Sequence, residues 1–401
     1  MSPSGASRSE GIGGAFFAII PAMKISKYSF GIGDRFAHEG VNQLKALVAA
    51  EKKFGVHFTP VWNKSNREHT IIGTEPMSTR READAAVKAL GYADAYFCDA
   101  DHINITNVDR FIDACDFFTL DVADSIGKAG TAAERYDGAI RKAGELYRHI
   151  AAKKGAGNFV TEVSMDEVDR AQTPEEVKYI LTKIAEEKIP VQTFAPKFTG
   201  RFNKGVDYVG DLGRFAQEFE EDLKVIRWAV RELGLPDNLK LSIHSGSDKF
   251  SIYPIMGRLV RQYDMGLHIK TAGTTWLEEV IGLALADPAA LRLAKRIYRE
   301  ALARRDELTV PYATVIDVDV AKLPDPDAVD GWDAQTFAKT LRHDEAEPLY
   351  NPSFRQLIHV SFKVAAELKD EFIPALERSA DVIGREIEAN LGDRHIRRLF
   401  A

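Results

Sequence analysis

Cysteine is scarce in this chain, which has only Cys98 and Cys115 among its 401 residues. No C-x-x-C pair occurs, and this excludes a four-cysteine zinc module and a haem attachment site. Both cysteines stand in apolar runs, YFCDA and DACDFF, a setting typical of buried thiols in a reducing compartment. We therefore expect a cytoplasmic protein.

Long hydrophobic runs and an excess of basic residues are missing too. No apolar run approaches the roughly 18 residues that a membrane span needs. The 53 Lys and Arg stand against 60 Asp and Glu, a net charge of −7. Such a chain has no overall attraction to nucleic acid or to an anionic membrane. We expect a small-molecule partner instead, and the oligomeric state stays open.

Several familiar catalytic motifs are also absent. The sequence has no P-loop, no G-x-S-x-G elbow and no H-E-x-x-H helix. The turn after the first predicted strand, GIGDRF, is not G-x-G-x-x-G, and it puts Asp34 where a phosphate would lie. We therefore expect no nucleotide cofactor.

What the sequence does contain is a regular alternation of strand-like and helix-like segments. Gly55 is expected to close the first helix, and Thr79 and Thr173 each begin a capping box. Long helices are predicted over 132–153, 210–234 and 274–305. Eight short apolar segments, each followed by a helical pattern, predict an α/β fold of the (β/α)₈ TIM-barrel type. An open doubly wound sheet is the competitor. The segments are 27–33, 57–62, 94–100, 116–122, 158–164, 189–195, 239–245 and 266–272.

The chain divides into three predicted regions. Residues 1–22 are expected to be a disordered leader, since Arg8 alone gives no basic region for a signal peptide. Residues 23–305 form the catalytic barrel. Residues 306–401 begin with a stretch rich in Pro and Asp and return to a helical period. We expect them to be an irregular loop and an α-helical C-terminal extension that caps the barrel.

Two histidines on neighbouring strands predict a metal site. His244 ends the seventh strand and His268 lies in the eighth. Neighbouring strands are about 4.8 Å apart, so the two imidazoles could share one divalent ion. Glu162 would complete the site, since a lone Glu in an apolar strand is costly without a partner. Zinc is the first expectation, with Mn, Co, Ni and Fe open. A core role is the alternative for either histidine, and Glu162 could simply pair with a lysine.

Basic and polar side chains at the other strand ends are candidate substrate ligands, because a barrel enzyme works at the C-terminal ends of its strands. Lys270 shares a strand face with His268 and could bind a substrate carboxylate, with a salt bridge inside the protein as the alternative. Asp101-His102 fits a helix-capping loop. His359 is expected to be a packed histidine on an amphipathic helix, and His343 is expected to be a solvated surface residue. The remaining candidate ligands are Arg35, Lys249, Asn63, Ser125 and Lys197.

Eight stretches of the sequence carry a family resemblance. They are FGIGDRFAHEG (30–40), PVWNKSNREHTIIGTEP (60–76), FCDADHINITNVDRF (97–111), FTLDVADSIG (118–127), FVTEVSMDE (159–167), TFAPKFTGRFNKGVDYVGD (193–211), SIHSGSDKFSIYPIMG (242–257) and HIKTAGTTWLEE (268–279). Together they span nearly the whole chain from Met23 onward. On these stretches the chain resembles the tagaturonate/fructuronate epimerase family.

The resemblance implies a divalent-metal enzyme of hexuronate catabolism that interconverts D-tagaturonate and D-fructuronate. The carbon that changes is β to the ketone, so enolisation cannot invert it. Two routes remain. Transient oxidation by bound NAD is disfavoured by the missing nucleotide motif, and the other route is retro-aldol cleavage and re-addition on a metal. For the acid/base we expect Asp124 first and Asp101 second, with Glu162 also in the catalytic group. A class II-type aldolase or ketose isomerase on the same barrel is the first alternative, and a non-catalytic sugar-acid-binding protein is the second.

Overall fold

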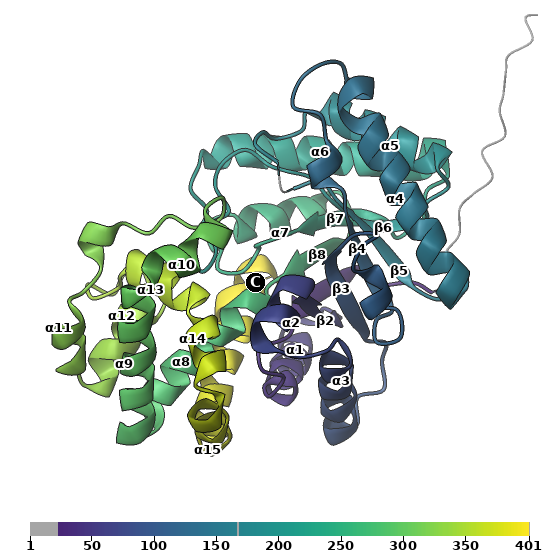
Figure 1. Ribbon diagram of the computed structural model, residues 1–401. Helices are drawn as coiled ribbons and strands as arrows, with labels where there is room; N and C mark the ends of the chain where they lie inside the picture. The colour runs from purple at the N-terminus through teal and green to yellow at the C-terminus, as the bar shows by residue number, and fades with distance from the viewer. Residues whose placement is uncertain (1–22, 167, 401) are drawn as a thin grey trace, which may run out of the picture.

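Eight parallel strands close into a barrel in chain order, from β1 to β8 (Figure 1). The structure is a computed structural model, and it describes residues 23–166 and 168–400. The strands are β1 (Tyr28–Ile32), β2 (Thr59–Ser65), β3 (Phe97–Ile103), β4 (Phe117–Asp121), β5 (Val160–Ser164), β6 (Val191–Ala195), β7 (Lys240–Ile243) and β8 (Leu267–Lys270). The predicted barrel is confirmed. The predicted leader, residues 1–22, lies outside the described residues.

The barrel interior is apolar at one end and polar at the other. A small apolar cluster fills the N-terminal end of the strands and consists of Ile25, Val61, Phe97, Phe117 and Val160. Two residues further along each strand the inward positions become polar, because side chains alternate with period two. Asp99, Thr119 and Glu162 occupy these positions on β3, β4 and β5. The chemistry therefore lies at the C-terminal end of the barrel.

Helices cover the outside of the barrel, with one exception to the predicted pattern. β3 and β4 are joined through the short 3₁₀ turn η1 (Val108–Arg110) instead of a helix. The covering helices are α1 (Gly40–Phe54), α3 (Met77–Leu90), α4 (Ala132–Lys154), α5 (Pro174–Glu186), α6 (Leu212–Leu233), α7 (Tyr253–Gln262) and α8 (Thr275–Ala286), and the short α2 (Asn66–Ile72) follows β2.

The helix ends show which capping signals the structure uses. Thr173 caps α5 with a complete capping box, and Gly55 ends α1 with a φ of 67°. The prediction at Thr79 is wrong, since α3 has already begun at Met77. The helix predicted over 274–305 is two helices, because Asp287 accepts from two backbone amides and Pro288 starts α9 (Pro288–Ala303).

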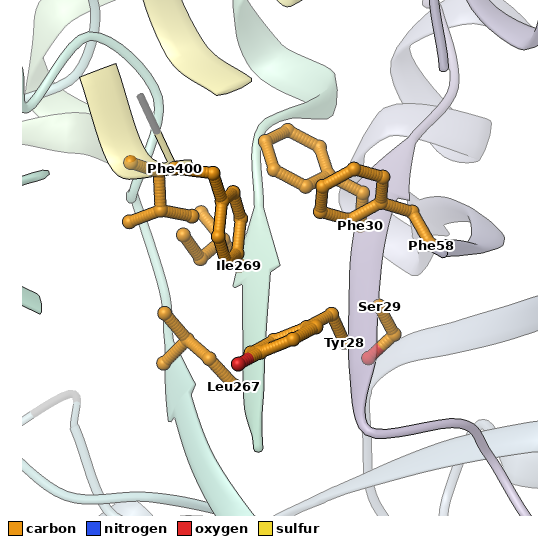
Figure 2. Close-up of a pocket in the computed structure, with 8 residues that line it drawn as sticks. Tyr28, Ser29, Phe30, Phe58, Leu267, Ile269 and Phe400 are labelled. Atoms are coloured by element: carbon orange, nitrogen blue, oxygen red, sulfur yellow. The ribbon is translucent and has the colours of Figure 1, made fainter. Parts of the chain in front are cut away.

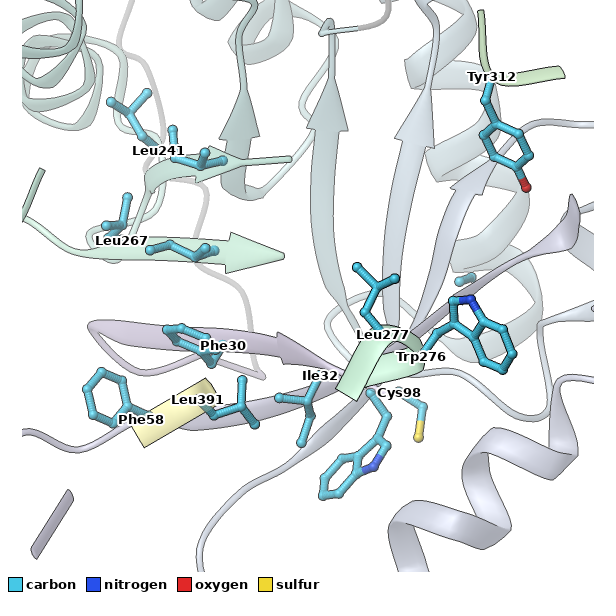
Figure 3. Packing of buried hydrophobic residues seen from close by; sticks show 14 of the residues in the cluster. Phe30, Ile32, Phe58, Cys98, Leu241, Leu267, Trp276, Leu277, Tyr312 and Leu391 are labelled. Atoms are coloured by element: carbon cyan, nitrogen blue, oxygen red, sulfur yellow. The ribbon is translucent and has the colours of Figure 1, made fainter. Parts of the chain in front are cut away.

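The C-terminal region folds back over α8 and α1. Its helices are α10 (Arg305–Thr309), α11 (Pro326–Asp330), α12 (Ala334–Leu341), α13 (Pro352–Val360), α14 (Phe362–Glu367), α15 (Lys369–Glu388), the π-helical η6 (Ala389–Ile396) and α16 (Arg397–Phe400). α15 packs on α8 and α1, and α8 is consequently buried along its whole length up to Ala284. Figure 3 shows Trp276 and Leu277 of α8 in this buried layer.

The last turn of the chain is also packed against the barrel. Phe400 contacts Tyr28 and Phe58, with ring centroids 4.8 and 5.2 Å apart (Figure 2). It thereby covers the N-terminal part of β1. Within the described residues, no helix combines the length and hydrophobicity required to cross a membrane.

Candidate active site

Lys270, the last residue of β8, lies at the centre of a buried charged group. Its Nζ is 2.8 Å from Asp99 Oδ2, 2.7 Å from Asp101 Oδ1 and 2.9 Å from Glu162 Oε1. It also donates to Thr119 Oγ1 at 2.6 Å. The ammonium thus pairs with carboxylates of the protein, which was the alternative to direct binding of a substrate carboxylate.

The charges of this group are strongly coupled. Burial lowers the pKa of Lys270, but the three surrounding carboxylates outweigh it and hold that pKa well above its usual value. Burial, with the neighbouring charges of Asp101 and Glu162, raises the pKa of Asp99 to about 7. Asp99 can therefore gain or lose a proton near neutral pH, whereas Lys270 stays charged.

A second group of ionisable side chains adjoins the first through Glu162. His244 Nε2 lies 2.7 Å from Glu162 Oε1, and His244 Nδ1 lies 3.2 Å from Asp166 Oδ1. The ring of His102 lies 4.9 Å from that of His244, and His102 Nδ1 is 3.2 Å from Asp121 Oδ2. Burial disfavours both imidazolium ions, but the carboxylates around them raise the pKa of His244 to about 9 and that of His102 to about 10.

His102 reaches this position because β3 is irregular there. The register between β3 and β4 shifts between Ala100 and Ile103, and His102 has a φ of +51°. In a regular strand His102 would point away from the interior, since Asp99 and Asp101 point into it. A bulge with one left-handed residue redirects the side chain. The capping-loop interpretation of Asp101-His102 is therefore wrong: both residues belong to the end of β3.

His102, Asp166 and His244 fit a metal site. Each offers one ligand atom, and these atoms all lie within 4.8 Å of one another. Two imidazoles and one carboxylate suit zinc, manganese, iron, cobalt or nickel. Asp121 and Glu162 hold the histidine rings from outside, as carboxylates commonly do around metal ligands.

The structure does not bring the predicted partner His268 into this group. The residue opposite His268 on β7 is Ser242, two residues before His244, so the two histidines lie at different depths in the barrel. His268 Nδ1 is 2.8 Å from Ser29 Oγ, and its ring packs 5.4 Å from that of Phe117. Glu162, the third ligand of the predicted site, pairs with Lys270 and His244. The fact that β7 and β8 are neighbours does not show how far His268 is shifted along the barrel relative to His244.

Of the predicted substrate ligands, Asn63 lies next to Lys270, and Arg35 lies at the same end of the barrel. The Asn63 side chain lies beside Gly31 of β1: an added Cβ at Gly31 would lie 3.2 Å from Asn63 Nδ2 and 2.9 Å from Lys270 Cα. Arg35 follows β1, pairs with Glu68 at 2.7 Å and lies 4.9 Å from the ring of Phe362. Both are buried at the C-terminal end of the barrel.

The other predicted residues lie apart from Lys270. Lys249 Nζ donates to the backbone carbonyls of Asn203, Val206 and Ser247, so it holds loops together. Ser125 accepts from Lys142 of α4 at 2.9 Å.

Asp124 is exposed in the 3₁₀ turn η2 (Ala123–Ser125). The backbone of Lys197 pairs with Gln172, and its side chain is half-buried. Among the described residues, neither side chain has a hydrogen bond or ion pair to the two charged groups around Lys270 and His244. Nothing in the structure supports Asp124 as the acid/base.

The sequence of the C-terminal two thirds identifies the family. The model of the tagaturonate epimerase family, UxaE, matches residues 129–399. The chain belongs to the tagaturonate epimerase family. The resemblance seen in the sequence is thereby confirmed, and with it the expectation of an enzyme of the isomerase class.

Relatives of this epimerase-family chain agree in sequence and in fold. The chain is 25% identical to the tagaturonate/fructuronate epimerase of Thermotoga maritima, over 92% of its own length and 80% of the relative's. The glycerol-complexed crystal structure of fructuronate-tagaturonate epimerase UxaE from Cohnella laeviribosi matches with a TM-score of 0.81 at 22% identity, covering 95% of this chain and 83% of that one. The native crystal structure of the same enzyme gives a TM-score of 0.78 at 22% identity, with the same coverage.

Proposed function

We propose that this chain interconverts D-tagaturonate and D-fructuronate with the help of one divalent metal ion. The observation that carries the proposal is the meeting of His102, Asp166 and His244 beside the Lys270 group, at the end of the barrel where such enzymes work. The relative from Thermotoga maritima that matches nearly the whole chain is named for this reaction.

The residues that would hold the ion are His102, Asp166 and His244. When bound there, the ion supplies the positive charge that polarises the ketone of the substrate. Zinc is our first expectation, and Mn, Co, Ni and Fe fit the same ligands. The proposed reaction transfers no hydride and therefore needs no nucleotide.

The chemistry is a cleavage and re-formation of one carbon–carbon bond. The ketone is C2 of the substrate and the carbon that inverts is C4. The C4 hydroxyl gives its proton to a base, the C3–C4 bond breaks, and its electron pair becomes the enediolate of a three-carbon ketose fragment. The other product is an aldehyde that carries the carboxylate. A half-turn about C4–C5 presents the opposite aldehyde face, the bond re-forms, and the proton returns to the C4 oxygen.

Asp101 is the side chain that we propose as the acid/base. It is the least buried of the three carboxylates around Lys270, since its side chain is 19% exposed and those of Asp99 and Glu162 are fully buried. Lys270 holds Asp101 in place and, against the effect of burial, lowers its pKa, and it connects Asp101 to Asp99, whose pKa is raised by burial. We place Asp101 ahead of Asp124, because Asp124 is exposed and outside the group.

The two cysteines support a reducing environment for this enzyme. Cys98 and Cys115 are free and buried, and burial raises the pKa of each thiol well above its usual value. Both thiols are therefore unreactive and fill space in the core. We propose that the enzyme works in the cytoplasm, and fractionation of the producing cells tests this.

The test of the proposed function is a ¹H NMR time course of D-tagaturonate with protein stripped by a chelator. Zn, Mn, Co, Ni and Fe are then added back one at a time. We expect fructuronate to appear only after metal is added. Three-carbon fragments as the sole products would identify an aldolase on the same barrel. No conversion with any metal, while the protein still binds the sugar acid, would identify a binding protein.

A further inference from the structure

His359, on α13 of the C-terminal region, is buried without a hydrogen-bond partner. Only 3% of the residue is exposed, yet neither Nδ1 nor Nε2 has a partner among residues 23–166 and 168–400. Buried polar atoms are almost always paired, so two free nitrogens on one ring call for a ligand. The packed-histidine interpretation of the sequence does not account for them.

The ring is held against bare backbone at the C-terminal end of the barrel. Gly205, in the loop after β6, has a φ of +76°, and a Cβ there would lie 3.4 Å from His359 Nδ1. Gly273, in the turn after β8, is closer still, since a Cβ would lie 3.1 Å from His359 Cε1. Backbone without a side chain thus lies close to both edges of the ring, and a Cβ at either glycine would crowd it.

Arg35 shares the space over Gly273. A Cβ at Gly273 would lie 3.5 Å from Arg35 Nη2 and equally 3.5 Å from His359 Nε2. Arg35 Nη1 already pairs with Glu68 at 2.7 Å, while Arg35 Nε is buried and unpartnered within the described part of the chain. Two donor groups, one from the barrel and one from the C-terminal region, therefore meet beside Gly273.

The charge of the pair suits a singly charged, planar anion. Burial, together with the positive charges of Arg35, Lys204 and Arg355, lowers the pKa of His359 well below its usual value. The ring is therefore neutral and can donate one hydrogen bond. Arg35 is the one cation of the pair, and it also pairs with Glu68 at 2.7 Å. A carboxylate accepts from both groups with its two oxygens, whereas a phosphate would bring more charge than the pair balances.

We infer that Arg35 and His359 bind the carboxylate of the substrate and retain the aldehyde fragment while the carbon–carbon bond is broken. The inference rests on the proposed function, in which the fragment that must rotate is the one that bears the carboxylate. β1, which leads to Arg35, lies between β8 with Lys270 and β2 with Asn63, so the carboxylate end and the reacting end of one sugar acid adjoin. A fragment anchored only at its carboxylate can turn about C4–C5 without leaving.

His359 can reach the barrel because the C-terminal region closes over it. α14, which follows α13, packs on α2 (Figure 1). Its Phe362 stacks on Arg35. The C-terminal region would thereby supply a substrate ligand as well as stability.

The first test compares His359→Leu, His359→Gln and Arg35→Met with wild type in the metal-loaded full chain. Lys363→Ala, on the outer face of α14, is the matched control. Loss of a hydrogen bond to a charged group predicts a KM for D-tagaturonate raised about tenfold or more in His359→Leu. His359→Gln restores one hydrogen-bond donor and should therefore reverse part of this rise in KM. Released dihydroxyacetone and tartronate semialdehyde should appear in the variants and not in the control. An unchanged KM with no released fragment in His359→Leu and Arg35→Met would overturn the inference.

The second test does not depend on turnover. Saturation-transfer NMR measures binding of D-glycerate, which matches the aldehyde fragment in size and charge, and of uncharged glycerol to the full chain. We expect wild type to bind D-glycerate and His359→Leu and Arg35→Met to lose that binding while circular dichroism stays unchanged. Equal D-glycerate binding by wild type and both variants would refute the carboxylate site even if the enzyme is an epimerase. If wild type binds D-glycerate and the variants do not, the site stands even if tagaturonate is not the substrate.

Discussion

Glu162 Oε1 lies 2.7 Å from His244 Nε2, and the same oxygen lies 2.9 Å from Lys270 Nζ. One carboxylate oxygen thus connects the candidate metal ligands to the lysine that holds the proposed acid/base. Glu162 supports both groups from the fully buried interior of β5. Its role is to position His244 and Lys270 in relation to each other.

Glu162→Gln keeps the shape of this link and removes its charge. His244 then lacks the anion that orients its ring, and loss of such an outer partner typically costs about 10–100-fold in metal affinity or activity. We expect both to fall by that factor, as measured by metal competition titration and by the epimerisation rate. Glu175→Gln, exposed in the first turn of α5, is the control. Full metal affinity in Glu162→Gln would show that Glu162 does not support the site.

Lys270→Met leaves the carboxylates of Asp99, Asp101 and Glu162 without their cation. Removing one partner of a buried ion pair costs about 3–5 kcal/mol of unfolding free energy, and urea unfolding measures this. Asp99→Asn in the same chain removes one of the stranded charges and should recover part of the loss. Lys183→Met, whose pair with Glu186 lies at the surface, should cost less than about 1 kcal/mol. A Lys270→Met chain as stable as wild type would contradict this view of the group.

Gly282→Ala tests the contact between the barrel and the C-terminal region. A Cβ at Gly282 of α8 would lie 2.5 Å from Ile383 Cγ1 and 2.7 Å from Ile383 Cα of α15. The helices must separate, and such overpacking costs about 1–3 kcal/mol. In Gly138→Ala the new Cβ meets only Ser125 O, at 3.9 Å, and that variant should be at least as stable as wild type. Equal melting temperatures for the two variants would show that α8 and α15 are not so close.

His69 predicts a loss of stability in acid. Burial, helped by Lys64 and Arg110, lowers the pKa of His69 to about 3. The unfolded chain binds a proton here below about pH 6.5 and the folded chain does not, so stability is present above pH 6.5 and is lost as pH falls toward 3. Between pH 7 and pH 5 the loss is about 2 kcal/mol. Between pH 7 and pH 5, the unfolding free energy of His69→Gln should fall by about 2 kcal/mol less than that of wild type, as measured by urea unfolding. Identical pH dependence would refute the assignment.

Much of the fold could be predicted from the sequence. All eight strands were found because each is a short apolar run, and Thr173 and Gly55 gave correct helix ends. The break at Asp287-Pro288 was missed, although a proline after a capping residue is a helix start signal. The helical period continues on both sides of that break, and periodicity alone cannot show a change of direction.

The candidate site was harder to predict, because it depends on registers and bulges. Lys270, Asp101, Glu162 and His244 were found as polar residues at strand ends. His102 was missed because alternation points it outward, and only the bulge in β3 turns it in. Asp166 stands two residues beyond β5, where its sequence position alone did not distinguish it from other loop carboxylates. His268 lies two residues deeper than His244, because Ser242 is the residue opposite it, and the sequence does not show how far one strand is shifted along the next.

The most direct test of the account is the metal content and epimerisation rate of Asp166→Asn beside those of His268→Asn. Elemental analysis of the purified proteins and the NMR assay of D-tagaturonate give both numbers, and circular dichroism confirms folding. If His102, Asp166 and His244 hold the ion, Asp166→Asn loses metal and activity, whereas His268→Asn keeps its metal. Metal retained in Asp166→Asn and lost in His268→Asn would contradict the account and restore the site of His244, His268 and Glu162.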